Sequence, residues 1–95
     1  MIVTGRIRKG AYFDSITLMR GGREIAAMKG ILDAAVVMGT KSNKAILNSS
    51  GLAVPLFDDA DEADLLIVVK AGSREAAAAA LAAADALFKG AGKKV

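Results

Sequence analysis

The segment from Gly39 to Lys44 collects the groups of this chain that are best suited to bind an anion. It reads Gly-Thr-Lys-Ser-Asn-Lys and follows an apolar run that ends at Met38. The first N–H groups of a helix carry partial positive charge, and lysine adds a full one. We therefore expect a turn that binds a phosphate or carboxylate. The residues that would bind it are Gly39, Thr40, Ser42, Asn43 and Lys44.

A purely structural interpretation of the same turn stays open. Thr40 or Ser42 is a suitable N-cap for a following helix, and the lysines would then lie in water. The segment is not a P-loop, because the glycine spacing and the Gly-Lys-Ser order are wrong.

Asp14 and Ser15 form a second polar pair, and we include them among the ligand-binding candidates. Asp14 stands where an N-cap belongs, which is a more frequent role than catalysis. A Ser15 nucleophile would lack a histidine base, since the chain contains no His. The absence of Cys removes thiolate chemistry as well. We expect no catalytic residue, no metal site and no cofactor in this chain.

The 95 residues correspond to one domain, which we place at 1–90, with 91–95 as a disordered tail. No apolar run approaches the roughly 20 residues of a membrane span, and the N-terminus does not resemble a signal peptide. These features predict a cytoplasmic protein without a membrane partner. A net charge of +3 is too weak to indicate nucleic acid, which is not expected as a partner.

Residue patterns predict three strands and three helices. The first helix contains Gly21-Gly22, so it either breaks there or lets another group approach its backbone closely. The segment from Leu52 to Phe57 contains the only proline and is predicted to be a loop or edge segment. The strands are predicted at Val3–Phe13, Ile31–Met38 and Ala63–Lys70, and the helices from Asp14 or Ser15 to about Met28, at Ser42–Asn48, and from Ser73 to about Lys89.

This order predicts a small α+β, ferredoxin-like sandwich with its helices on one sheet face. The βαββαβ pattern is present except for its last strand, so one sheet edge would lack a neighbour. We therefore expect a homo-oligomer that forms through the open edge. The alternative is a three-stranded parallel α/β unit with right-handed crossovers.

Several segments follow one another in a familiar order, namely Tyr12–Met19, Asp33–Thr40, Asn43–Leu47, Asp64–Ala71 and the alanine-rich helix after it. Together they resemble the N-terminal region of FdrA proteins, which are related to the α subunit of succinyl-CoA synthetase. The resemblance implies an accessory or assembly domain of an acyl-CoA synthetase-like or carbamoyltransferase-like complex, with larger FdrA-like or CoA-ligase-like subunits as partners. The chain alone would not be catalytic, and the reaction of the complex would be that of an acyl-CoA ligase or a carbamoyltransferase.

A second functional hypothesis belongs to a different class. Small α+β domains of this size also act as regulatory modules that sense small molecules, as the ACT domains do. Such a module would dimerise through its sheet edge and bind a metabolite without larger subunits.

Overall fold

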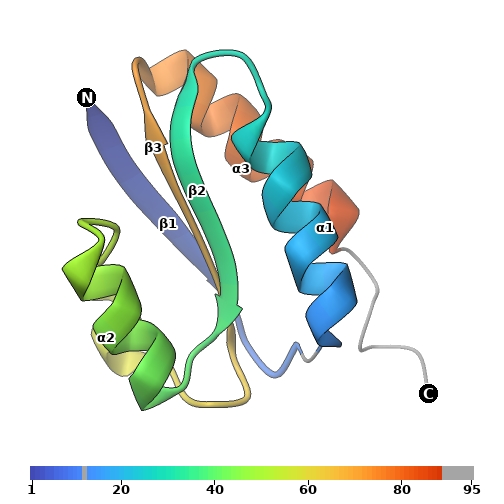
Figure 1. Ribbon diagram of the computed structural model, residues 1–95, viewed down its shortest axis with the longest axis vertical. Coiled ribbons are helices and arrows are strands. Elements are labelled where there is room, and N and C mark those ends of the chain that lie inside the picture. Colours follow the sequence, from blue (N-terminus) through green and yellow to red (C-terminus); the bar gives the residue numbers. More distant parts are fainter. Residues whose placement is uncertain (12, 89–95) are drawn as a thin grey trace.

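The structure is a computed structural model that describes residues 1–11 and 13–88. Its strands and helices alternate in nearly the predicted order (Figure 1). The predicted tail at 91–95 lies outside the described residues. The elements are β1 (Ile2–Arg8), α1 (Ser15–Ala26), β2 (Ile31–Met38), α2 (Lys41–Ser49), the 3-10 helix η1 (Pro55–Asp59), β3 (Leu65–Ala71) and α3 (Arg74–Leu87).

The three strands form one sheet in the order β1-β3-β2. β3 lies in the middle and is antiparallel to both neighbours. Within residues 1–11 and 13–88 the elements follow the ferredoxin-like βαββαβ order up to its second helix on the sheet, so the predicted α+β fold is confirmed. The parallel α/β alternative is wrong, because no pair of neighbouring strands in the sheet is parallel.

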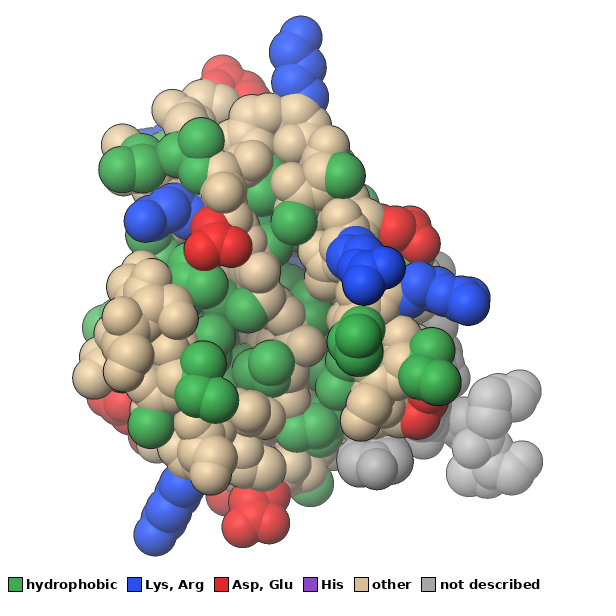
Figure 2. Space-filling model, in the orientation of Figure 1, with side chains coloured by type: hydrophobic (Ala, Val, Ile, Leu, Met, Phe, Trp, Pro, Cys, Tyr) green, Lys and Arg blue, Asp and Glu red, His purple; other side chains and the backbone are tan. Residues whose placement is uncertain are grey.

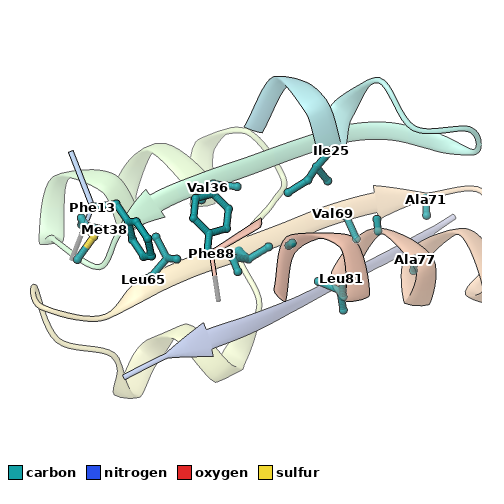
Figure 3. Close-up of a cluster of buried hydrophobic side chains, with 13 residues drawn as sticks. Phe13, Ile25, Val36, Met38, Leu65, Val69, Ala71, Ala77, Leu81 and Phe88 are labelled. Carbon is teal, nitrogen blue, oxygen red and sulfur yellow. The ribbon is translucent and has the colours of Figure 1, made fainter. Parts of the chain in front are cut away.

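The central strand β3 explains why both faces of the sheet are covered. Each residue from Leu65 to Val69 is fully buried, with an exposed fraction of 0%. Successive side chains of a strand point to opposite faces, so an uninterrupted apolar strand needs cover on both. Leu65, Ile67 and Val69 belong to the core cluster shown in Figure 3, whereas Leu66 and Val68 belong to the cluster on the other face.

The helices divide between these two faces. α1 and α3 lie together on one face, as predicted, while α2 lies on the opposite face (Figure 1). The prediction of helices on one face therefore holds for α1 and α3, and α2 differs. The physical reason is that Leu66 and Val68 need apolar partners, which α2 and η1 provide. These partners are Leu47, Leu52, Phe57 and Ala60.

Helix α1 runs without a break through Gly21-Gly22. The ring of Phe88 lies directly against the Gly21 backbone, where a Cβ atom would overlap it. Phe88 also meets Phe13 edge to face, with ring centroids 5.0 Å apart and an interplanar angle of 74°. Of the two alternatives left open by the glycine pair, close approach is therefore the one observed.

Most predicted boundaries shift by one or two residues, and two segments differ more clearly. β1 ends at Arg8 rather than Phe13, because Gly10 has a φ of +66° and turns the chain out of the strand. Phe13 then enters the core as part of a loop. The loop predicted around Pro55 contains the short helix η1, where proline occupies the first turn.

Candidate functional site

The turn between β2 and α2 uses its polar groups to hold the fold together. Thr40 is the N-cap of α2, and its hydroxyl accepts a hydrogen bond from the Asn43 N–H at 3.1 Å. The Asn43 side-chain amide donates to the Met38 carbonyl at 2.8 Å. The Gly39 N–H donates to the Asp64 carbonyl at 2.9 Å.

Lys44 and Gly39 have structural roles in the same turn. The Lys44 ammonium donates to the Ala60 carbonyl at 2.6 Å, which ties α2 to the loop before β3. Gly39 is buried, and a Cβ atom there would overlap the Asp61 carbonyl. Of the five residues predicted here, Ser42 alone is exposed. The anion-binding role of the turn stays a prediction, and the structural interpretation already accounts for Gly39, Thr40, Asn43 and Lys44.

Asp14 acts as the N-cap of α1. Its carboxylate accepts from the Thr17 N–H at 3.3 Å and from the Thr17 hydroxyl. The hydrogen bond from the hydroxyl is the main cause of the lowered pKa of Asp14. Ser15 is the exposed first residue of the helix. The capping interpretation of this pair therefore describes the observed contacts.

A groove of about 390 Å³ runs along the outer edge of β2, between α1 and α2. It brings together three predicted site residues, namely Ser15, Thr40 and Asn43, but not Asp14, Gly39, Ser42 or Lys44. Figure 2 shows apolar side chains gathered on this face between the two helices. The apolar lining consists of Phe13, Leu18, Met19, Val36, Val37 and Met38.

Asp64 connects two loops by hydrogen bonds, a role that was not predicted from the sequence. The residue is 4% exposed, and its carboxylate accepts hydrogen bonds from the backbone N–H groups of Gly10 and Asp61, both at 2.9 Å. The Lys9 ammonium lies 3.3 Å away. These hydrogen bonds, first that from Asp61 and then that from Gly10, lower the pKa of Asp64. The position of Asp64 directly before an unbroken apolar strand is the sequence feature that could have indicated a buried, hydrogen-bonded acid.

One hydrogen bond shows in which direction the backbone N–H and C=O groups of each strand point. Antiparallel pairs alternate between hydrogen-bonded and non-bonded residues. Because the Gly39 N–H donates to the Asp64 carbonyl, every second β3 residue after Asp64 directs its backbone groups toward β2. The β3 residues between them direct theirs toward β1. The β3 residues whose backbone groups point toward β1 are Leu65, Ile67, Val69 and Ala71.

The outer edge of β1 is consequently open among the described residues. The β1 residues paired with the β3 residues that direct their backbone groups toward β1 have their own backbone groups directed toward β3. They are Arg8, Arg6, Thr4 and Ile2. The backbone N–H and C=O groups of Val3, Gly5 and Ile7 point away from β3. Residues 1–11 and 13–88 provide no hydrogen-bond partner for these groups.

The outer edge of β2 is partly blocked by its own side chains. The Asp33 carboxylate accepts from the Ala34 N–H at 2.9 Å, near the start of the strand. The Asn43 amide occupies the Met38 carbonyl at the other end. Charged and polar side chains of this kind prevent edge strands from pairing. The two edges of the sheet therefore differ, and among the described residues β1 has the edge whose outward backbone groups are not engaged by side chains.

The fold and these contacts define a small ferredoxin-like α+β domain. A family model described as "AllF, heavy metal-associated domain" matches residues 1–95, so the chain belongs to that family. The chain is 36% identical over 67 residues to the "Uncharacterized protein YahF" of Escherichia coli (strain K12). That match covers 70% of this chain but 13% of YahF, a much longer protein. No solved structure matches significantly.

The family match corrects the resemblance to FdrA proteins, which was wrong: the family model over the whole chain is the AllF domain. The shared segments around Asp14 and Met38 belong to that domain. The role in an acyl-CoA synthetase-like or carbamoyltransferase-like complex was implied by the resemblance alone, and the match does not test it.

The residues present do not fit the heavy metal that the family description implies. Soft metals are held mainly by thiolate and imidazole groups, and the chain has neither Cys nor His. Within residues 1–11 and 13–88, no three acidic side chains gather into a possible metal site. The remaining soft donors are four methionine thioethers.

No helix in the described part of the chain is both long and apolar enough to cross a membrane. The cytoplasmic location stays a prediction.

Proposed function

We propose that this chain is a non-catalytic assembly domain, which joins a larger protein or complex by accepting a partner strand beside β1. The observation that carries the proposal is the open edge of β1, where the backbone groups of Val3, Gly5 and Ile7 have no partner among the described residues. A strand placed there would complete the four-stranded sheet of the βαββαβ pattern.

Two further observations support an assembly role over a catalytic one. The polar side chains that were predicted to bind a ligand instead make capping and loop hydrogen bonds. Examples are Thr40, Asn43 and Lys44. The chain also spans a small part of YahF, as a domain of a larger protein would.

The proposal can be tested with Val3→Pro and its matched control Val3→Ala. The N–H of Val3 faces outward, so proline removes an edge donor without breaking a bond to β3. Both variants remove the branched valine side chain, whereas only proline removes the N–H that pairing would use. The chain is co-expressed with the products of the genes beside its own, and complexes are measured by sedimentation velocity.

We expect a stable complex that survives Val3→Ala and dissociates with Val3→Pro. The chain sedimenting alone with every neighbouring product, or a complex equally stable with both variants, would contradict the proposal. Circular dichroism of the free variants confirms that each is folded.

A second candidate function is a regulatory module that senses a small molecule. The groove beside β2 favours it, because its volume of about 390 Å³ and its apolar lining are typical of small-ligand sites. A metabolite screen by thermal shift tests this function. A stabilising compound whose effect disappears with Met19→Glu would support it, and no stabilising compound would count against it.

A further inference from the structure

The two sides of β1 differ in chemistry. Arg6 and Arg8 lie on the side of the sheet that α3 covers, and Asp85 of α3 forms ion pairs with both. One carboxylate thus serves two guanidinium groups, which leaves one positive charge in excess at this edge. The side chains on the opposite side are apolar or absent, namely Val3, Gly5 and Ile7.

Arg8 also has an unused donor. Its Nε atom is buried and has no hydrogen-bond partner in the described part of the chain. An unpaired donor of a charged group is costly to bury, and a carboxylate is its best acceptor. The Asp85 Oδ1 atom lies 3.7 Å from another nitrogen of Arg8 and is itself buried without a hydrogen-bond partner, while Oδ2 of the same carboxylate pairs with Arg6. Arg6 is the more exposed of the two guanidinium groups, so a second carboxylate at this edge would meet Arg6 first and offset the excess positive charge.

We infer that the strand accepted by β1 is an extended, acidic segment of a partner protein, with acidic side chains toward α3 and apolar side chains on the other side. This inference rests on the proposed function and names the chemistry of its partner. Residues directly opposite in an antiparallel pair have Cβ atoms about 5 Å apart. Acidic residues at alternate positions would therefore meet Arg6 and Arg8, while apolar residues extend the surface of Val3 and Ile7.

Two other occupants fit the edge less well. A second copy of β1 in antiparallel pairing would bring Arg6 and Arg8 of both copies onto the same side, where like charges repel. Residues 89–95 of the chain contain three lysines and two glycines, so they would add positive charge and have low strand propensity. The expected homo-oligomer stays a prediction, and these charges oppose its formation through β1.

The test uses two synthetic peptides and the full chain labelled with ¹⁵N. In one peptide valine alternates with glutamate, and in the other lysine replaces glutamate. Amide shifts and hydrogen exchange are followed at Val3, Gly5 and Ile7. We expect rapid exchange in the free chain and protection by the glutamate peptide. The glutamate peptide should bind about tenfold more tightly than the lysine peptide, and added salt should reduce the difference.

Two variants test the charges in opposite directions. Arg6→Gln should weaken binding of the glutamate peptide several-fold, because it removes an attractive charge. Asp85→Asn should strengthen it, because it removes the competing carboxylate. Loss of folding cannot produce both results.

The contrary results separate failure of the inference from failure of the proposed function. If both peptides protect the three amides equally, the acidic partner is wrong and the strand-accepting edge stands. If neither peptide binds, or the amides are already protected in the free chain by residues 89–95 or by a second copy, both the inference and the proposed function fail. Shifts confined to the groove beside β2 would also overturn both.

Discussion

Asp64 joins two loops at one end of the sheet. It accepts backbone hydrogen bonds from Gly10, in the β1–α1 connection, and from Asp61, before β3. Four other acidic residues closely precede it and are all exposed, namely Asp58, Asp59, Asp61 and Glu62. Asp64 differs because it directly precedes the buried strand, where an acid must find partners. Composition alone does not distinguish it from its exposed neighbours.

The Asp64 contacts make stability depend on pH. The folded state lowers the pKa of Asp64 below its ordinary value of 3.8. The stabilisation is therefore complete above that value and is lost as the pH falls through the lower folded pKa. Asp64→Asn should lower the melting temperature at neutral pH and reduce the loss of stability in acid. Asp58→Asn, at an exposed position, is the control and should change neither.

Thermal unfolding followed by circular dichroism between pH 2 and 7 measures both effects. Equal melting temperatures for Asp64→Asn and the unchanged chain would show that the Asp64 hydrogen bonds do not stabilise the fold.

Gly21 and Gly22 are neighbours in α1 with opposite packing. Gly21→Ala would push a methyl group into the Phe88 ring and should destabilise the domain by about 1–3 kcal/mol. Gly22→Ala meets its nearest atoms, on Val36, at 4.0 Å, so it should stabilise α1 by up to about 1 kcal/mol. Urea unfolding measures both. Similar effects of the two substitutions would contradict the packing of Phe88 on α1.

At the scale of elements, local signals predicted most of the fold. β2 has the predicted bounds, because a long apolar run ends abruptly before Gly39. α3 begins after the predicted Ser73 cap. Local signals could not predict on which face of the sheet α2 packs, because this depends on the apolar side chains of β3 that α2 covers. Nor could they predict which sheet edge is blocked, since this depends on Asp33 and Asn43 reaching neighbouring backbone groups.

Thr40 caps the N-terminus of α2 through its hydroxyl group. Thr40→Ala should destabilise the domain by about 1 kcal/mol, because the Asn43 N–H loses its acceptor. Thr40→Ser keeps the hydroxyl and should remain near the stability of the unchanged chain. Chemical denaturation provides the comparison. If both variants are equally unstable, the methyl group rather than the cap is the important part of Thr40.

At the scale of the whole molecule, the chain combines a heavy metal-associated family with a sequence that lacks the usual soft ligands. We expect no tight binding of Zn²⁺ or Cu⁺, because neither thiolate nor imidazole is present. Equilibrium dialysis against each ion measures this directly. Stoichiometric, saturable binding of either ion would show that methionine or carboxylate groups form a site. It would contradict our conclusion that the residues of this chain do not fit a heavy metal.

The measurement that tests the assembly role most directly is amide hydrogen exchange along β1, in the free chain and in its complex with a co-expressed partner. We predict that Val3, Gly5 and Ile7 exchange rapidly in the free chain, whereas Thr4 and Arg6, whose N–H groups face β3, are protected. In the complex, all five should be protected. Slow exchange of the outward amides in the free chain, or rapid exchange in the complex, would contradict the account.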